Sequence, residues 1–431
     1  MAHTVEQIWH PNFHAMGPRR ARRGGRYLAF VPDLLVDHPF HLDARIVADL
    51  SDAERAIIEL DRQAVPPSPD DGPAVLPHRL DVLARVLLRA EAVGSSQIEG
   101  LVVSPQRLER LRFSADPDRS GGAGEVLGNI EALQEALELA TVPGPFTVEQ
   151  LCQVHHTLLQ RGGLAHLGGL VRQEQNWIGG LTPVQAAFVP PPPTEVPRLL
   201  HDLCAYVSND AHSPLMQAAL AHAQFETVHP FADGNGRTGR ALLQLVLRRR
   251  GLCHHFVPPI SLVLATWSDP YIEALMGTRT TDPAALAAGW SSWVELVAAA
   301  AQAACRHTRR YGLALDELRE EWRARVSTTH GHLRSDAAVW RLLDHLPAIP
   351  MLDATLARQV TGRSQRPVDQ ALAQLVEAGV IKQVRSGQRY RVYETPDVFR
   401  LITTTERALA SPRGDTQQAP PNRPVPILMP E

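Results

Sequence analysis

Apolar residues recur at helical spacing along most of the first 330 residues of the chain. Val126, Ile130, Leu133 and Leu137 follow one another at steps of four, three and four residues, so they share one face of a helix. Similar spacing predicts five further helices. One begins at Ser51, one contains Leu80–Leu87, and three span residues 195–228, 237–250 and 290–327. The chain is therefore expected to be mainly α-helical.

Two short motifs predict where helices begin. In Ser51-Asp-Ala-Glu54 and in Thr147-Val-Glu-Gln150, a hydroxyl residue is followed three positions later by Glu or Gln. In such a capping box the hydroxyl accepts a hydrogen bond from a backbone N–H of the first turn, and the later side chain reaches back. We therefore expect helices to begin at these two places.

The helical pattern is interrupted between residues 168 and 193. Glycines, Trp177, Phe188 and Val189 alternate there with polar residues, and four consecutive prolines follow. Proline lacks a backbone N–H and breaks a helix, whereas alternation is typical of strands. This segment is expected to form a β-hairpin outside the helical bundle.

A different order of elements is predicted near the C-terminus. Two short helical patterns, within 355–364 and 368–378, are followed by the strands 380–384 and 390–393, with a turn at Gly387. A helix-turn-helix followed by such a wing predicts a small α/β winged-helix domain, a fold common in DNA-binding proteins.

These patterns divide the chain into four expected segments. They are an N-terminal helical segment at 1–110 that starts with a polar arginine-rich arm, a helical domain at 111–327, the winged-helix domain at 328–408 and a disordered tail at 409–431. Residues 64–77 are rich in Pro, Asp and Gly and are expected to be a loop.

Composition excludes several classes of protein. With 43 basic and 46 acidic residues the formal charge is −3, so a polyanionic partner would need a local basic patch. The four cysteines form no CxxC pair, which argues against a zinc site or a disulfide framework. We find no signal-peptide core and no stretch that is long and apolar enough to span a membrane. A cytoplasmic location without membrane contact is expected.

One run of residues carries the chemistry of a phosphate site. Two glycines within Gly234–Gly236 precede a helix, and a helix N-terminus that follows such a loop presents several backbone N–H groups to an anion. Arg237 and Arg240 share one helix face and suit phosphate oxygens. Asp233 is a magnesium-type carboxylate, and His229 can accept a proton near neutral pH. Together they predict attack on a nucleoside triphosphate.

The run HPFADGNGRTGR at residues 229–240 resembles the signature of the Fic family at every fixed position. The resemblance implies an all-helical catalytic domain that moves AMP from ATP to a Ser, Thr or Tyr hydroxyl of a target protein, releases pyrophosphate and uses Mg²⁺. Relatives that phosphorylate instead carry lysine where this chain has Gly236. The implied roles are general base for His229, metal ligand for Asp233, and nucleotide binding for Gln224, Gly234, Asn235, Gly236, Arg237 and Arg240.

Two further segments resemble parts of the same family. Asn176-Trp177-Ile178-Gly179, within the hairpin 168–193, is similar to the family's flap, which holds a target segment by strand addition. Upstream, Ser95-Ser-Gln-Ile-Glu99-Gly100 is similar to its inhibitory motif. That resemblance implies that Glu99 pairs with Arg240, because one guanidinium cannot serve both a carboxylate and the γ-phosphate fully.

Three functions remain open at this stage. The first is an adenylyltransferase inhibited by Glu99; the second is a hydrolase that removes AMP from modified proteins; the third is a non-enzymatic winged-helix regulator that binds DNA. Residues 355–400 contain eight basic and four acidic residues, and this excess of positive charge does not decide between DNA and a protein as the partner. We expect residues 328–408 to recruit a target or to form a homodimer, with DNA binding as the alternative.

Overall fold

The computed structural model describes residues 1–10, 24–63, 77–111, 113, 121–386, 390–411, 421 and 425. Several expectations lie outside the described residues. They concern the arginine-rich arm at 11–23, the loop at 64–76, the turn at Gly387 and the tail beyond 411.

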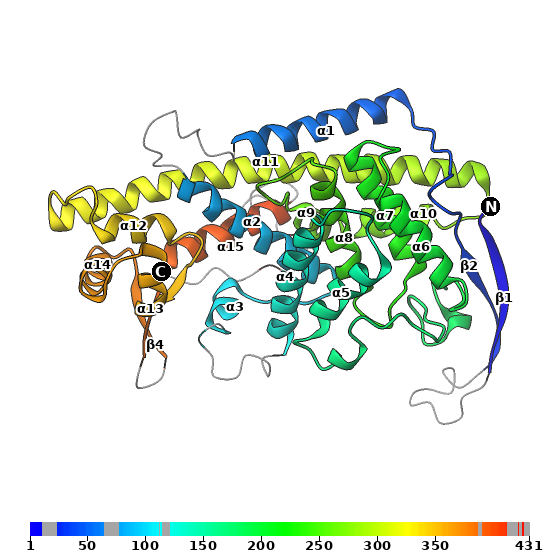
Figure 1. Ribbon diagram of the computed structural model, residues 1–431, viewed down its shortest axis with the longest axis horizontal. Coiled ribbons are helices and arrows are strands. Elements are labelled where there is room, and N and C mark those ends of the chain that lie inside the picture. The colour runs from blue at the N-terminus through cyan, green and yellow to red at the C-terminus, as the bar shows by residue number, and fades with distance from the viewer. Residues whose placement is uncertain are drawn as a thin grey trace. The chain divides into compact units, whose positions relative to one another are not determined.

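The predicted fold class is confirmed. The described residues form mainly α-helices, together with a two-stranded and a three-stranded antiparallel sheet (Figure 1). The chain divides into two compact units, and both are assembled from segments far apart in the sequence. The division into four consecutive segments stays a prediction.

The first unit comprises residues 1–57, 128–254 and 267–302. Its elements are β1 (His3–Trp9), β2 (Gly25–Val31), most of α1 (Ala44–Gln63) and α4 (Gly122–Leu139), α5 (Val148–Leu159), η4 (Ala165–Leu167), η5 (Pro183–Gln185), α6 (Val196–Val207), α7 (Pro214–Val228), α8 (Asn235–Arg249), α10 (Ser268–Gly277) and the first part of α11 (Pro283–His330).

The second unit comprises residues 58–127, 255–266 and 303–431. Its elements are α2 (Pro77–Ile98), α3 (Pro105–Leu111), α9 (Ile260–Thr266), the rest of α11, α12 (Ala338–His345), β3 (Met351–Asp353), α13 (Ala354–Thr361), α14 (Gln365–Glu377), β4 (Lys382–Ser386), β5 (Tyr390–Glu394) and α15 (Pro396–Ala410).

Of the two predicted capping boxes, one is confirmed and one is wrong. The Thr147 hydroxyl accepts from the Gln150 N–H while the Gln150 side chain accepts from the Thr147 N–H, as expected for the start of α5. Ser51 lies inside α1, because the chain is already helical from Ala44. Glu54 instead accepts a hydrogen bond from the backbone N–H of Leu215, at the first turn of α7, over 2.8 Å.

We expected a polar arm at the N-terminus, but its described residues include two paired strands. β1 and β2 pair antiparallel along seven residues each, from His3 opposite Val31 to Trp9 opposite Gly25 (Figure 1). Ala29, Phe30 and Val31 are buried at the end of β2, so this hairpin is anchored by its C-terminal part.

The single helix expected over residues 195–228 is two helices. α6 ends at Val207, and α7 begins at Pro214, whose fixed φ suits a first helical position. α7 is buried from Leu215 to Val228, which makes it the central helix of the first unit. α11 packs against it, since the Trp293 indole N–H donates to the backbone oxygen of Ala219 over 2.8 Å.

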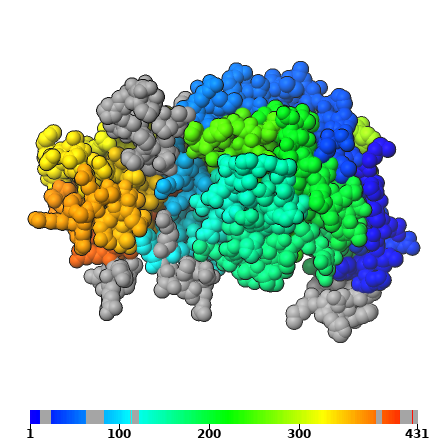
Figure 2. Space-filling view, viewed as in Figure 1, coloured from blue at the N-terminus to red at the C-terminus, as the bar shows by residue number. Residues whose placement is uncertain are grey.

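The winged-helix prediction is confirmed within the second unit. α13 and α14 form the helix-turn-helix, and β4 pairs with β5, which also pairs with β3. The orange atoms of residues 351–386 gather in one body in Figure 2. The end of α11 belongs to its core, where Trp322 and Val326 are buried.

One expectation about hydropathy was wrong. α11 is a 48-residue helix that is long and apolar enough to cross a membrane by length and composition alone, although 44% of its most apolar window is buried. Alanine accounts for much of this hydropathy. Its buried residues, including Trp293, Val294 and Val297, are those of a core helix, and the same test also selects such helices.

Candidate active site

The HPFADGNGRTGR run lies in the first unit, where it ends α7, forms a short loop and opens α8. His229 is the C-cap of α7, with φ 49° and ψ 59°. It is the only residue other than glycine with positive φ in the described part of the chain. Such a backbone is costly for a side chain with a Cβ and persists only when neighbouring contacts hold it.

The ring of His229 has a defined orientation. Its Nδ1 lies 3.3 Å from the backbone oxygen of Glu226, one turn earlier in α7. Because a carbonyl oxygen only accepts, Nδ1 must be the donor, and in the neutral ring the lone pair is then on Nε2. The carboxylate of Glu226 is also near, with Oε2 at 3.9 Å from Nδ1. This arrangement suits a general base that accepts a proton at Nε2.

The loop after His229 is closed by Asn235. The side-chain oxygen of Asn235 accepts from the Phe231 N–H over 2.9 Å, and its amide nitrogen donates to the Phe231 oxygen over 2.8 Å. The Asn235 side chain is therefore used inside the loop. Its backbone N–H, in the first turn of α8, is the group that could meet a phosphate.

His155 of α5 contacts the loop at Phe231 and Asp233. Its ring stacks on Phe231 with 3.7 Å between ring centroids. Its Nδ1 accepts from the Gly169 N–H over 3.0 Å, so its Nε2 carries the proton and donates to the Asp233 oxygen, also over 3.0 Å. Burial lowers the pKa of His155 to about 4, so the ring is neutral at physiological pH.

Asp233 and Gly234 stand at the entrance to α8. The Asp233 side chain is 45% exposed, and its Oδ1 lies 3.2 Å from Arg237. Gly234 has φ 77°, and a Cβ there would meet Leu158 at 3.0 Å, so both the backbone and the space favour glycine. The described residues contain no cluster of three or more His, Cys, Asp or Glu able to hold a metal. One accessible carboxylate nevertheless fits Mg²⁺ bound mainly by substrate phosphates and water.

The two arginines of the run are buried in the first turns of α8. Arg237 is 6% exposed and Arg240 is 2% exposed. Gly239 lies between them and allows α8 to approach α7, because a Cβ there would stand 2.8 Å from both the Phe225 ring and the Glu226 carboxylate. The sequence interpretation gave Gly239 no role, although a glycine inside a helix was a signal of close packing.

The segment 168–193 joins the loop mainly through Arg172. Its guanidinium donates to the backbone oxygens of His229 over 2.9 Å and of Pro191 over 2.7 Å, with further bonds to Glu174 and Val228. One side chain thus holds both arms of the flap and the strained backbone of His229. Its position in the sequence gave no sign of this role.

The four flap residues singled out in the sequence have different environments. The Asn176 amide donates to the oxygens of His229 and Phe231, so it fastens the flap to the loop. Trp177 contacts Trp9 of β1 edge to face, at 5.3 Å between centroids. Ile178 forms one isolated bridge with Phe188, and Gly179 has φ 71°. The expected hairpin is therefore reduced to a single bridge.

Arg279, before α11, was missed by sequence reasoning. Its guanidinium lies 4.1 Å from the centre of the Phe188 ring and donates to the Glu226 oxygen over 3.1 Å. That oxygen also accepts from His229, so Arg279 connects the flap to the carbonyl that orients the imidazole. Nothing in the sequence around Arg279 distinguishes it from other arginines.

Gln224 and the upstream motif have their own partners. The buried Gln224 amide donates to the Asp33 oxygen over 2.8 Å, and its contact with nucleotide stays a prediction. In the second unit α2 ends at Ile98, and Glu99 and Gly100 form the turn that follows it. Ser95 is buried within α2, whereas Glu99 is exposed. A pair between Glu99 and Arg240 also stays a prediction.

Comparisons with known proteins agree with these motifs. The Fic/DOC family model matches residues 145–247, and the model of the Fic/DOC family N-terminal region matches 47–138. The protein adenylyltransferase fic-1 of Caenorhabditis briggsae is 32% identical over 125 residues, covering 29% of this chain and 23% of that protein. The protein adenylyltransferase Fic of Drosophila grimshawi is 38% identical over 151 residues, covering 34% and 29% respectively.

The chain thus spans less than a third of the length of these curated relatives. Among solved structures, a Fic family protein from Desulfovibrio desulfuricans G20 is 24% identical, with a TM-score of 0.48 over 83% of this chain and 98% of that one. The two family models include the motif at 229–240 and α2 with its Ser95–Gly100 motif. Two regions of this chain are therefore similar to the Fic/DOC family, residues 47–138 to its N-terminal model and residues 145–247 to its Fic model.

Proposed function

We propose that this protein is an adenylyltransferase that moves AMP from ATP to a Ser, Thr or Tyr hydroxyl of another protein. The observation that carries this proposal is the orientation of His229. Its Nδ1 faces the Glu226 carbonyl, and the lone pair on Nε2 belongs to a ring at the entrance of an amide-lined helix terminus. The curated relatives named above are protein adenylyltransferases, which supports the same reaction.

The reaction balances with the groups present. The target hydroxyl oxygen attacks the α-phosphorus of ATP and gives its proton to Nε2 of His229. A new P–O bond forms, the bond between the α-phosphorus and the bridging oxygen breaks, and pyrophosphate leaves. Asp233 would hold Mg²⁺, which would neutralise phosphate charge. The N–H groups that open α8 and the side chains of Arg237 and Arg240 would hold the remaining phosphate oxygens.

The flap would place the target hydroxyl. A target segment that adds to an edge of the flap pairs through its backbone, so it is held without strong selection of its sequence. Because the Asn176 amide already bonds to the loop, Trp177 and Ile178 are the flap residues better suited to meet a target. Mispositioning the flap should therefore slow transfer more than it weakens ATP binding.

Glu99 would act as the inhibitor of this reaction. A carboxylate that occupies the Arg240 guanidinium competes with the γ-phosphate and leaves the α-phosphate badly aligned. The same glutamate could instead activate water for removal of AMP from a modified protein. Hydrolysis is thus the second candidate function, and it rests on the same residue.

Labelled ATP distinguishes these functions. We expect Glu99→Gly to raise self-labelling and target labelling by at least about tenfold, and His229→Ala in the same background to abolish both. Glu99→Gln is the matched control that keeps the side-chain volume but removes the charge, and it should also raise labelling. Loss of label from premodified protein would favour the hydrolase. Labelling that survives His229→Ala would refute the proposal.

The winged-helix domain would recruit a target or a second copy of the chain. Target recruitment, dimerisation and a cytoplasmic location all stay predictions. Size-exclusion chromatography with light scattering, with and without residues 328–431, would test the dimer.

A further inference from the structure

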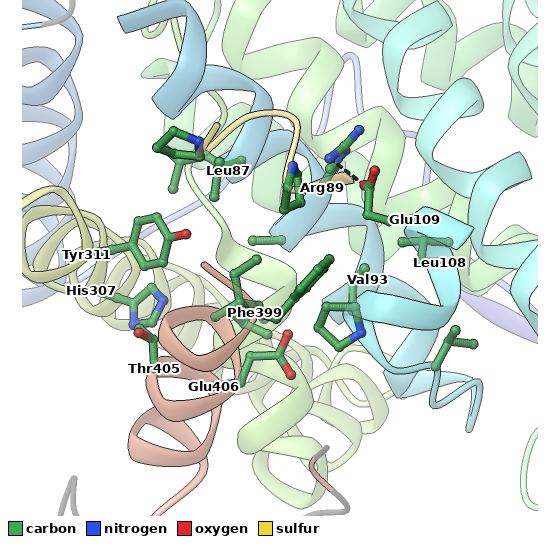
Figure 3. A pocket seen from close by; sticks show the side chains of 18 residues that line it. Leu87, Arg89, Val93, Leu108, Glu109, His307, Tyr311, Phe399, Thr405 and Glu406 are labelled. Atoms are coloured by element: carbon green, nitrogen blue, oxygen red, sulfur yellow. Dashed lines mark ion pairs between the residues drawn. The ribbon is translucent and has the colours of Figure 1, made fainter. Parts of the chain in front are cut away.

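An apolar cavity lies within the second unit, apart from any residue of the HPFADGNGRTGR run. Its volume is about 70 Å³. Figure 3 shows its walls, which come from α2, α3, α9, α11 and α15 and from the segment that follows α12. The volume is about half of that of an engineered apolar cavity of roughly 150 Å³ that binds benzene. It suits a molecule smaller than benzene.

The charged residues of the lining already have partners. Arg89 and Glu109 form an ion pair at 2.6 Å, marked by dashes in Figure 3. Glu406 is buried and has a partner as well. Most of the remaining wall is aliphatic or aromatic, including Leu87 and Phe399. An uncharged, mainly apolar molecule is therefore the occupant that this wall favours.

Besides Oε2 of Glu406, one polar atom in the wall has no hydrogen-bond partner in the described part of the chain, the Tyr311 hydroxyl. The Tyr311 side chain is 4% exposed, and its hydroxyl has no partner in the described part of the chain. In Figure 3 it points towards the middle of the cavity. Burial raises the pKa of Tyr311, so the phenol is protonated at neutral pH and can donate. A buried donor without a partner is destabilising, and an acceptor oxygen in the cavity would satisfy it.

The cavity also borders the helix that leads to Glu99. Leu87, Ala90 and Val93 of α2 line it. The other side of α2 is fixed to α9, because the Glu91 carboxylate accepts from the N–H of Ser261 over 2.7 Å and from its hydroxyl over 2.5 Å. α2 therefore forms a wall of the cavity only while it stays packed on α9.

We propose that this cavity is a binding site for a small uncharged molecule, mainly apolar, with one hydroxyl or carbonyl oxygen that accepts from Tyr311. Because the site exists only with α2 in place, linkage requires that the bound molecule stabilise that placement. The molecule is then a co-inhibitor of transfer. This second part rests on the proposed function, whereas binding itself does not.

Ligand-observed NMR titrations of the full chain test binding, with cyclobutanol as the probe, because it is smaller than benzene. Wild-type protein should bind cyclobutanol saturably and should not bind protonated cyclobutylamine. Tyr311→Phe should weaken cyclobutanol binding about 3- to 10-fold, the worth of one hydrogen bond, and leave cyclobutane binding unchanged. Ala90→Leu should fill the cavity and weaken both by at least about tenfold.

Ala84→Leu, the same change on α2 at a residue outside the lining, should leave binding unchanged. Equal binding to wild type and Ala90→Leu, or none to wild type, would overturn the site. In labelling assays, saturating cyclobutanol should lower self-labelling of the wild-type protein at least about twofold and should not lower that of Glu99→Gly. Unchanged self-labelling of the wild-type protein would overturn co-inhibition. If Glu99→Gly never labels, the proposed function fails while the titrations still decide the site.

Discussion

At the scale of residues, two buried histidines make folding sensitive to acid. His155 has a pKa of about 4 and His222 one of about 3, mainly because burial disfavours the charged ring. His222 is further disfavoured as a cation by Arg240, and its Nε2 lies 3.0 Å from the Tyr271 hydroxyl. Both rings are neutral in the folded protein and titrate near 6.5 when unfolded.

The free energy of unfolding should therefore fall as the pH drops from about 6.5 to about 4. In that range the unfolded chain binds more protons than the folded one, and His155 alone accounts for on the order of 3 kcal/mol. Urea unfolding at a series of pH values measures this. His155→Phe should flatten the dependence while lowering stability at pH 7, and the exposed control His166→Gln should change neither. An unaltered slope in His155→Phe would contradict the assignment.

Arg172 gives a second prediction at this scale. Arg172→Lys keeps the charge but cannot bond to four backbone oxygens at once, so the His229 loop should lose its position. We expect the kcat of transfer to fall by about 10- to 100-fold with little change in ATP affinity. Arg198→Lys, at an exposed residue that pairs with Glu195 three positions earlier, is the control. A raised KM for ATP with unchanged kcat would show that Arg172 acts on nucleotide binding instead.

At the scale of elements, the packing of α2 on α9 depends on one glycine. A Cβ on Gly94 would stand 2.5 Å from the backbone of Leu262, which cannot move without displacing α9. Gly94→Ala should therefore lower the free energy of unfolding by about 1–3 kcal/mol. Gly312→Ala in α11 is the matched control of opposite sign, because nothing lies within 4 Å of its added Cβ. It should stabilise by about 0.5–1 kcal/mol. Thermal and urea unfolding compare the two, and equal stabilities would contradict this.

Elements differ in how far the sequence predicted them. α4, α5 and the winged-helix elements follow local periodicity and caps, and they lie where expected. α1 begins earlier than Ser51 because its first two turns also bury Ile46 and Leu50, which overrides the local cap. The β1–β2 pairing was missed because an arginine-rich stretch separates the two strands in the sequence, so that no local pattern joins them.

At the scale of the whole molecule, the charge of the winged-helix domain bears on its partner. The exposed face of α14, the second helix of the helix-turn-helix, carries Arg366, Asp369 and Glu377. This helix face carries one basic and two acidic residues, although residues 355–400 as a whole contain eight basic and four acidic ones. Binding to duplex DNA relies on Lys and Arg at phosphates, and α14 is the helix that would enter the groove. We therefore expect no shift of duplex DNA by the full chain at about 150 mM salt. A shift that weakens steeply with added salt would favour the DNA-binding regulator.

The sequence by itself determined the family motif, the helical class and the winged-helix order, because each depends on residues close together in the chain. Only the tertiary structure decided how His229 is held. Arg172 and Asn176 bond to its backbone oxygen, and Arg279 bonds to the Glu226 oxygen that orients its ring. These contacts cross long stretches of sequence and depend on how α7, α8 and the flap pack. The same holds for Glu54, whose capping partner lies 161 residues away. Spacing encodes neighbours along a helix or strand, whereas hydrogen bonds between distant segments exist only once the core has formed.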